Sequence, residues 1–319
     1  MAKSIFDEPR FQDPQAAREY LETLRWPSGA VCPHCGGADR QAKIEANAAK
    51  KVRPGLYECG HCHQQYTVTV GTVFERSKIA LHKWLMAATL IAASKKGMSS
   101  HQLHRMLGVT YKTAWFMSHR LREAMKSGGG LMGGGGGVIE ADETYLGHST
   151  GGRRAKRRNS KKVSRVLALV DRDGTTRAFA VPDVTIKTLK PILQAQIAKD
   201  THLMTDSASQ YRHMNTGFKA HEMINHLAGE YAKPSRKAKG VTLHTNTVEA
   251  FFGMLKRGLH GTYHHVSQEH LQRYCEEFSF RYSYRTETDV TRADAILKNI
   301  GGKRLTYRRT DTNKESVVN

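Results

Sequence analysis

Over the first 127 residues, hydrophobic positions recur mainly with the period of an α-helix, and one segment with paired cysteines interrupts them. The first helix begins with an Asp followed by a Pro, which is typical of a helix N-terminus. After the cysteines, the Val- and Thr-rich residues 64–77 predict a β-strand. The helices predicted from the pattern cover residues 13–25, 79–97, 99–107 and 111–125.

Residues 128–137 are almost all glycine, which loses too much conformational entropy to favour a helix or a strand. They predict a linker between two parts of the chain. Beyond it, strands and helices alternate, which predicts an α/β domain with a mixed sheet. The elements predicted there are a strand over 138–146, a hairpin over 164–183, a helix over 186–197, a strand over 201–207, and helices over 245–259 and 267–285.

The composition adds a strong positive charge. The 319 residues include 50 Lys and Arg against 29 Asp and Glu, a formal net charge of +21. Such an excess predicts a polyanionic partner, with nucleic acid as the default, although a solvated basic surface is the alternative. No apolar run approaches the roughly 20 residues of a membrane span, and the N-terminus lacks a signal peptide's apolar core. We therefore expect a cytoplasmic globular protein with no membrane partner.

Four of the five cysteines form two C-x-x-C pairs, Cys32 with Cys35 and Cys59 with Cys62. This pattern in a long intracellular chain favours a metal over disulfides. Four thiolates suit one tetrahedral Zn²⁺ and leave no open coordination position, so the predicted zinc is structural. A redox pair or chance spacing is the alternative. Cys275 lies in a helical pattern and is expected to be a lone core thiol.

The helices over 99–107 and 111–125 are joined by a short turn at Gly108 and resemble a helix-turn-helix. In such a motif Tyr111, Lys112 and Thr113 would face the major groove of DNA. The alternative is an ordinary helical hairpin, packed by Leu103, Leu107, Trp115 and Leu121.

Acidic residues are concentrated in the strand over 138–146. Residues two apart share a face of a strand, so Glu140 and Asp142 point one way and Glu143 the other. Asp206 ends the strand over 201–207. The helix over 245–259 carries Glu249 and Lys256 on one face, since they are seven residues apart.

Three acids from two strands and a helix would bind Mg²⁺, and two such ions can clamp the attacking and leaving oxygens of a phosphodiester. Each acid also has a structural explanation. Asp142 could pair with an Arg, Asp206 could cap a following helix, and Asn246 and Glu249 have the spacing of a capping box.

A basic stretch follows the acidic strand and has no acid among its members. We interpret it as a loop that contacts DNA phosphates, with a solvated loop as the alternative. Its cations are Arg153, Arg154, Lys156, Arg157, Arg158, Lys161 and Lys162.

The segments "VIEADETYLG", "LMTDSASQY" and "HTNTVEAFFGMLKRGLHGTYHHVSQEHLQRYCEEFSFRY", with the cysteine pairs, resemble bacterial insertion-sequence transposases of the ISXO-like type (family fifteen-ninety-five). The resemblance covers roughly residues 12–290. It implies a zinc ribbon and an RNase H-like catalytic domain, with Asp142 and Asp206 as the first two catalytic acids. The acid-to-lysine spacing of the family puts the third at Glu249 with Lys256, but some branches use an Asn, which would be Asn246.

The activity implied is binding of the element ends, with metal-dependent cleavage and strand transfer of double-stranded DNA. It uses two catalytic Mg²⁺ or Mn²⁺ ions and one structural Zn²⁺, and a homo-oligomer is expected on DNA. The rival hypotheses are a zinc-ribbon DNA-binding regulator without catalysis and an RNase H-like nuclease. The expected parts are an N-terminal helix (1–26), a zinc ribbon (27–78), a helix-turn-helix-like region (79–127), the linker (128–137), the catalytic domain (138–290) and a C-terminal tail (291–319).

Overall fold

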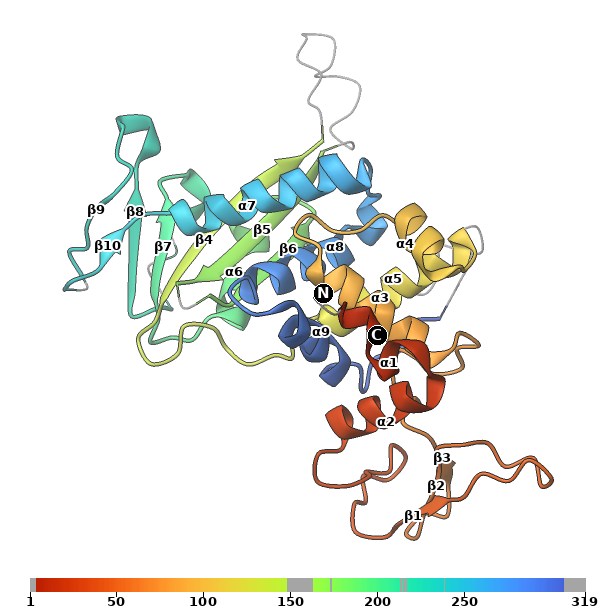
Figure 1. Cartoon of the computed structure of the whole chain (residues 1–319). Coiled ribbons are helices and arrows are strands. Elements are labelled where there is room, and N and C mark those ends of the chain that lie inside the picture. The colour runs from red at the N-terminus through yellow and green to blue at the C-terminus, as the bar shows by residue number, and fades with distance from the viewer. Residues whose placement is uncertain are drawn as a thin grey trace. The chain divides into compact units, whose positions relative to one another are not determined.

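The computed structural model describes residues 4–147, 163–172, 174–212, 214, 217–237 and 239–306 (Figure 1). Their contacts divide the chain into two compact units. The first unit combines the residues up to Ser94 with Met98–Met125 and the segment from Thr288 onward. The second contains Lys95–Gly97 and Lys126–Glu287. The basic stretch over 152–162 lies outside the described residues.

Helices dominate the first unit, and α3 lies at its centre. This helix contacts α2, α5 and α9, and its buried side chains include Trp84, Leu85 and Ile91. It ends at Ala93, earlier than the predicted Gly97, because Ser94 is already extended. The helices of this unit are α1 (Pro9–Gln12), α2 (Pro14–Arg25), α3 (Leu81–Ala93), α4 (Ser100–Leu107), α5 (Tyr111–Met125) and α9 (Asp289–Lys298), preceded by the 3₁₀ turn η1 (Ile5–Asp7).

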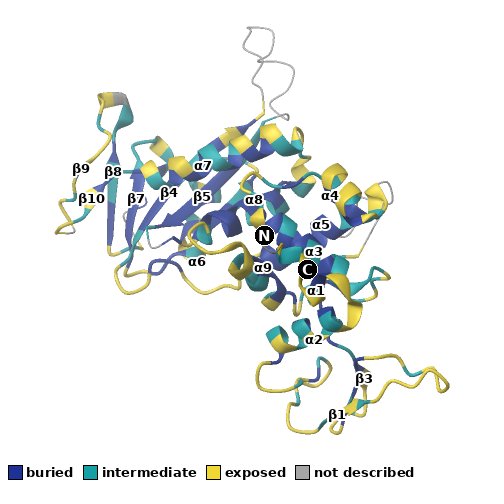
Figure 2. Ribbon diagram, viewed as in Figure 1, coloured by how far each residue is buried: buried dark blue, intermediate teal, exposed yellow. Residues whose placement is uncertain are grey.

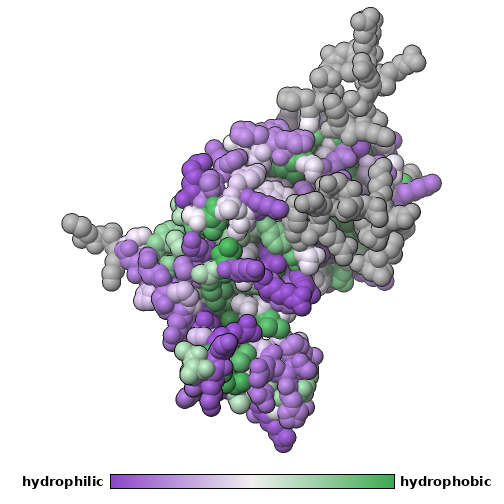
Figure 3. Space-filling view, turned by 90° about the vertical axis from the view of Figure 1, so that its right-hand side faces the viewer, coloured by the Kyte–Doolittle hydropathy of each residue, from purple (hydrophilic) through white to green (hydrophobic). Residues whose placement is uncertain are grey.

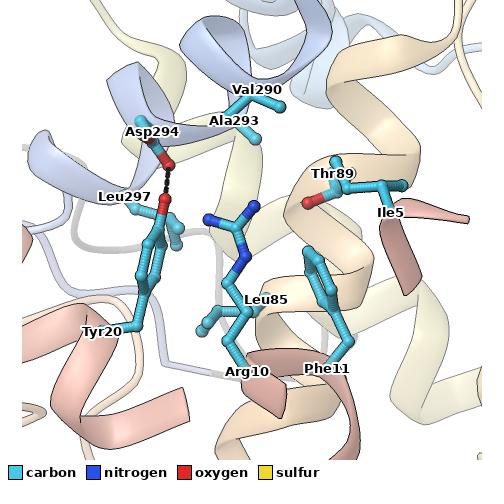
Figure 4. Close-up of a pocket in the computed structure, with 10 residues that line it drawn as sticks. All are labelled: Ile5, Arg10, Phe11, Tyr20, Leu85, Thr89, Val290, Ala293, Asp294 and Leu297. Carbon is cyan, nitrogen blue, oxygen red and sulfur yellow. Dashed lines mark hydrogen bonds between the residues drawn. The ribbon is translucent and has the colours of Figure 1, made fainter. Parts of the chain in front are cut away.

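The predicted C-terminal tail from residue 291 differs from the structure, because α9 belongs to the core of the first unit. Its Ala293, Ile296 and Leu297 are buried at helical spacing. Figure 4 shows Tyr20 of α2 reaching α9, where its hydroxyl donates to Asp294 Oδ1 at 2.6 Å. The space left among these side chains is about 10 Å³, room for at most one water. This contact is therefore core packing and leaves no room for a ligand.

The cysteine segment forms a small antiparallel sheet in the order β1-β2-β3, with β1 (Gln41–Ile44), β2 (Leu56–Cys59) and β3 (Gln65–Tyr66). The strand predicted over 64–77 is limited to Gln65–Tyr66, and turns follow it. Threonine side chains explain the difference. Thr72 Oγ1 donates to Thr69 O at 2.7 Å and accepts from Phe74 N at 3.0 Å, so these hydroxyls favour turns over a sheet ladder.

The second unit is built on a five-stranded mixed sheet in the order β6-β5-β4-β7-β8. Strands β4, β5 and β6 pair antiparallel, whereas β7 and β8 run parallel to β4. This arrangement confirms the predicted α/β class and is consistent with an RNase H-like domain. The strands are β4 (Val138–Leu146), β5 (Ser164–Asp171), β6 (Thr176–Val181), β7 (His202–Asp206) and β8 (Ala220–Ile224), with a separate pair of β9 (Lys233–Pro234) and β10 (Thr242–Leu243).

Helices cover both faces of this sheet. On one face α7 (Asn246–Gly258) contacts β4 and β5, and α8 (Gln268–Ser283) contacts β6. Their apolar sides bury side chains such as Val166 and Phe251 in one core cluster. On the other face, α6 (Ile186–Gln196) and Tyr211 of the 3₁₀ turn η4 (Ser209–Tyr211) form the second cluster, with Ile139 of β4. Figure 2 shows the buried positions concentrated in the strands and along the helix sides that face them.

The Gly-rich segment 128–137 contains no helix or strand, as predicted, but it is bound closely to the second unit. Met132 donates its N–H to Gln196 O at 2.8 Å and accepts from Ala198 N at 2.9 Å. Gly133 has φ +72°, and a Cβ there would lie 2.6 Å from Thr201 Oγ1, so only glycine fits. These contacts make the segment part of the second unit.

None of the helices in the described ranges has the length and apolar character that a bilayer crossing requires. Hydrophilic residues dominate the face of the protein shown in Figure 3, where hydrophobic residues form scattered patches.

Candidate functional site

The four paired cysteines converge on one point of the small sheet. Their Sγ atoms all lie within 4.8 Å of one another, with 3.7 Å between Cys32 and Cys62 and 3.5 Å between Cys35 and Cys59. Among the described residues, this is the one group of three or more Cys, His, Asp or Glu side chains that approach so closely. A tetrahedral zinc ion bound by four thiolates fits this donor set.

Backbone hydrogen bonds build the two cysteine turns. Gly36, at φ +77°, donates its N–H to Cys32 O at 2.9 Å, and His63 donates to Cys59 O at 2.8 Å. Hydrogen bonds from the backbone of Cys62 and His61 lower the pKa of Cys59 to about 6. Burial and hydrogen bonds with the neighbouring thiols raise the pKa of Cys62 to about 12, and a hydrogen bond with Cys59 raises that of Cys35, so without a metal the thiolate is favoured at Cys59 and disfavoured at these two. Cys275 is buried in the core between α8 and the sheet, as predicted, and burial raises its pKa.

Strand β4 places its acids on both faces of the large sheet, as its alternation predicts. Glu140 points to the α7 face, has no exposed surface and binds the start of that helix. Its Oε2 accepts from Thr247 N at 2.8 Å and Val248 N at 3.1 Å, and its Oε1 accepts from Thr247 Oγ1 at 2.9 Å. Arg172 Nε donates to Oε1 at 3.0 Å, and His244 Nδ1 lies 3.0 Å from it. Glu140 therefore caps α7 from the strand beneath that helix.

This cap replaces the predicted local one. The N-cap of α7 is Thr245, whose side chain makes no capping bond, so Asn246 and Glu249 do not form a capping box. The reason is that a buried carboxylate already satisfies the free N–H groups of the first turn. Sequence spacing could not reveal this, because the two partners are 107 positions apart.

Asp142 and Asp206 lie on neighbouring strands at matching positions. Glu140 of β4 pairs with Met204 of β7 in the parallel ladder. The paired positions of this ladder end there, and Asp142 and Asp206 each follow two residues later on the same face of their strands, near enough for the charge of Asp206 to act on Asp142. Asp142 Oδ1 accepts the N–H of Glu143 at 2.8 Å, and Asp206 Oδ1 accepts that of Ala208 at 3.0 Å. The second bond fits the structural explanation for Asp206 in part, since Ala208 precedes a 3₁₀ turn.

The electrostatic environment joins these acids to α7. Burial, followed by the charges of Glu143, Asp206 and Glu249, raises the pKa of Asp142 to about 7. Glu143 faces the other side of the sheet, where its carboxylate accepts from Gln210 Nε2 and, at 2.5 Å, from the hydroxyl of Tyr211. Burial also raises the pKa of Glu143, despite these hydrogen bonds. The sequence assigned no role to Glu143 or to its two donors.

The remaining predicted side chains lie along α7. Glu249 is half exposed, and its Oε1 lies 3.4 Å from His226 Nε2, a neighbour that no sequence signal indicated. Asn246 is exposed at the start of the helix, and Lys256 is half-buried two turns after Glu249. The charges of Asp206 and Glu249 act on Asp142, but the three carboxylates are less tightly clustered than the cysteines.

The predicted helix pair is present in the first unit. Gly108 ends α4 in the left-handed conformation at φ +58°, and Thr110 Oγ1 caps α5 by accepting from Thr113 N at 3.2 Å. Tyr111 is exposed and stacks on His101 at 4.3 Å between ring centres, and Lys112 beside it is also exposed. Of the residues expected to pack a plain hairpin, Leu103, Leu107 and Leu121 are buried and Trp115 is half-buried. This geometry is compatible both with a helix-turn-helix and with an ordinary helical hairpin.

Comparison with known proteins finds one family model in part of the first unit and another over most of the second. Residues 12–65 match the model of the transposase zinc-ribbon domain, and residues 135–283 match that of the ISXO2-like transposase domain. A protein of Halobacterium salinarum (strain ATCC 700922 / JCM 11081 / NRC-1), described as an uncharacterized protein in transposable element ISH50, is 25% identical over 296 residues, which cover 85% of this chain and 91% of that protein. No solved structure matches the chain. Because the two matching models describe parts of one transposase family and together span more than half of the sequence, this chain belongs to the ISXO2-like (IS1595) family of insertion-sequence transposases.

Proposed function

We propose that this transposase binds the ends of its insertion sequence, cleaves the DNA there and joins the freed 3′-hydroxyls to target DNA. Asp142, Asp206 and Glu249 would hold two Mg²⁺ or Mn²⁺ ions for both steps. The observation that carries the proposal is the raised pKa of Asp142, which comes first from burial and then from the charges of Glu143, Asp206 and Glu249, the last two on other elements. Such mutual repulsion is relieved by a divalent cation, whereas the structural acid Glu140 faces Arg172 and the first turn of α7.

The chemistry requires an anionic oxygen site next to the DNA backbone. Bound metal ions would activate the attacking oxygen and stabilise the leaving one. The carboxylates of this chain supply hard oxygen ligands, and adjacent strand positions fix Asp142 relative to Asp206. Glu140 fixes the first turn of α7, which carries Glu249. Lys256 would hold a DNA phosphate beside the ions.

For the third ligand we favour Glu249 over Asn246. A two-metal site gains more from an anion than from an amide, and the charge of Glu249 is among those that raise the pKa of Asp142. Asn246 is exposed and does not cap α7, so its loss has little reason to destabilise the fold.

Double-stranded DNA would contact the chain at several places. The start of α5, with Tyr111, Lys112 and Thr113, would enter a major groove. The basic stretch with Arg153, Arg154, Lys156, Arg157 and Arg158 would contact phosphates. Assembly of two or more copies would bring the element ends together.

A strand-transfer assay with labelled element ends tests this function and its rivals. We expect Glu249→Gln to abolish cleavage and joining while end binding and folding persist, with partial recovery in Mn²⁺. Asn246→Ala should remain active. Loss of chemistry in folded Asn246→Ala with an active Glu249→Gln would identify Asn246 as the ligand. Cleavage without joining would indicate a nuclease, and end binding without either reaction a regulator.

A further inference from the structure

The first unit contains a pocket of about 370 Å³ between α5 and the segment that leads into α3. This volume is in the range of small-molecule sites, about 300–1,000 Å³. A DNA duplex, whose major groove alone is about 12 Å wide, cannot enter it. The pocket is separate from the carboxylate site, since all of its lining residues belong to the first unit.

Positive charge dominates the lining. Four of the lining side chains are cations, and none is an acid: Arg76, Lys78, Lys112 and Arg120. Glu75, whose backbone oxygen accepts from Arg120, is an acid beside the pocket but not a lining residue. Its Oε2 accepts from Gly71 N at 3.1 Å, and its Oε1 lies 3.8 Å from Arg76 Nε and 3.9 Å from Arg304 Nη2. The pocket is therefore suited to an anion.

Arg120 supplies a second indication. The side chain is only 8% exposed, and Nη1 donates to Glu75 O at 3.2 Å. Its Nε has no hydrogen-bond partner in the part of the chain that the structure describes. That atom has less than 1 Å² of exposed surface, so a ligand in the pocket would meet the charge of the Arg120 guanidinium and not this Nε–H. Burial and then the charge of Arg304 lower the pKa of Arg120, and the charge of Glu75 only partly offsets them.

The remaining wall is aromatic. Lys112, Phe116 and Arg120 are four residues apart along α5 and so share one face of it. The ring of Phe116 is half-buried, and the Arg120 guanidinium lies 4.7 Å from its centre. The pocket hydroxyls already have partners, because Ser77 Oγ accepts from Trp84 Nε1 at 3.0 Å and Thr113 Oγ1 contacts Thr110 Oγ1 at 2.8 Å. Charge and stacking, not hydroxyl contacts, would then select the ligand.

A ligand that matches both the four cations and the ring of Phe116 carries a phosphate and a flat ring. We infer that this pocket binds one nucleotide, with its phosphate at the four cations and its base against Phe116. Aromatic stacking beside a basic groove is how proteins hold unpaired nucleotides without reading their sequence. The nucleotide can come from an unpaired strand of DNA or from the free pool, and the two sources share this chemistry. The inference does not depend on the carboxylate site.

The test uses the full-length zinc-loaded chain and isothermal titration with deoxyadenosine 5′-monophosphate. We expect measurable binding of this probe, and much weaker binding of deoxyadenosine and of inorganic phosphate. Phe116→Leu should weaken binding about 5- to 150-fold, the range for loss of one base stack. Lys78→Gln should also weaken it. Lys50→Gln, the same change at an exposed lysine outside the pocket, should bind like the wild type.

Competition distinguishes the sources. Lys112 and Thr113 line the pocket and also belong to the proposed duplex contact, so the two duplexes are compared with each other. A duplex with a short unpaired tail that displaces the mononucleotide at much lower concentration than a blunt duplex would identify a DNA strand as the ligand, and equal displacement by both would assign the pocket to the duplex contact and overturn the inference. Failure of both duplexes to compete would identify a free nucleotide. No binding of the mononucleotide, or binding unchanged in both Phe116→Leu and Lys78→Gln, would overturn the inference. Asp142→Asn should bind the mononucleotide normally, so the result stands apart from that of the transposition assay.

Discussion

Replacement of Glu140 by Gln tests whether this buried acid positions the proposed metal site. One carboxylate oxygen accepts two backbone N–H groups of α7, and the other faces Arg172, His244 and the Thr247 hydroxyl. A glutamine amide accepts at only one end. Whichever way it is oriented, its NH₂ group must face donors of the protein.

The cost follows from the burial of Glu140. Breaking a buried charge pair costs about 3–5 kcal/mol, part of which is the loss of a negative charge at a helix N-terminus, and the partial exposure of Arg172 at 23% favours the lower end. We therefore expect about 3 kcal/mol of destabilisation in the second unit. For a unit of about 150–250 residues this lowers the Tm by roughly 6–12 °C. The first turn of α7 would then hold Glu249 less firmly.

The measurement compares Glu140→Gln with Glu277→Gln at a temperature where both remain folded. Glu277 also has no exposed surface and pairs with an arginine, Arg281 at 2.6 Å, but it lies on α8. Both variants should unfold earlier than the wild type. Only Glu140→Gln should lose most of the Mg²⁺-induced rise in Tm and most of the cleavage rate. Equal losses in the two variants, or wild-type Mg²⁺ response in Glu140→Gln, would refute the positioning role.

Three further predictions concern other parts of the chain. Metal analysis should find about one Zn²⁺ per chain, and Cys32→Ser should unfold the cysteine segment, seen by hydrogen exchange, while the second unit stays folded; absence of zinc in protein purified without chelator would contradict this. Neutralising four of the seven cations in the stretch 153–162 should reduce the salt slope of DNA binding by about 0.9 for each phosphate that the chain then leaves unneutralised, and an unchanged slope would indicate a solvated loop. The Mg²⁺-induced rise in Tm should be small at pH 5.5 and larger at pH 8, because Asp142 must lose the proton that it holds up to about pH 7. A response independent of pH would show that Asp142 does not bind the ion.

The sequence predicted the fold best where periodicity was long and uninterrupted. Strand β4, the hairpin of β5 and β6, and helices α5 to α8 lie at or close to their predicted positions. Strand β8 was missed because "AHEMI" is short and mixes polar with apolar residues. The run after Tyr66 was overpredicted as a strand, since β-branched threonines can form local hydrogen bonds as readily as a ladder.

The residues of the candidate site could likewise be predicted only where the sequence carries a signal for them. Asp142 and Asp206 could be found because an acid within or at the end of an apolar strand is visible in the sequence. The role of Glu140 could not be predicted from the sequence, because it depends on which helix terminus packs against β4. His226 and Tyr211 reach the acids from 3₁₀ turns, which leave no periodic signal.

Glu140→Gln and Asp142→Asn both replace an acid by its amide, but we expect the first to destabilise the metal-free protein and the second to stabilise it. Glu140 faces cations and a helix N-terminus, whereas burial and neighbouring acids disfavour the charge of Asp142. The pKa of Asp142 is 3.8 in an unfolded chain and about 7 in the folded one. Between these pH values the folded chain binds more protons than the unfolded chain, so the stability falls as the pH rises. At about 1.4 kcal/mol per unit, the ionised side chain destabilises the metal-free protein by at most about 4 kcal/mol at pH 8. Asp142→Asn should therefore raise the Tm at pH 8 without metal, change it little near pH 4, and abolish the gain from Mg²⁺. A lower Tm at pH 8 would place Asp142 among the structural acids with Glu140.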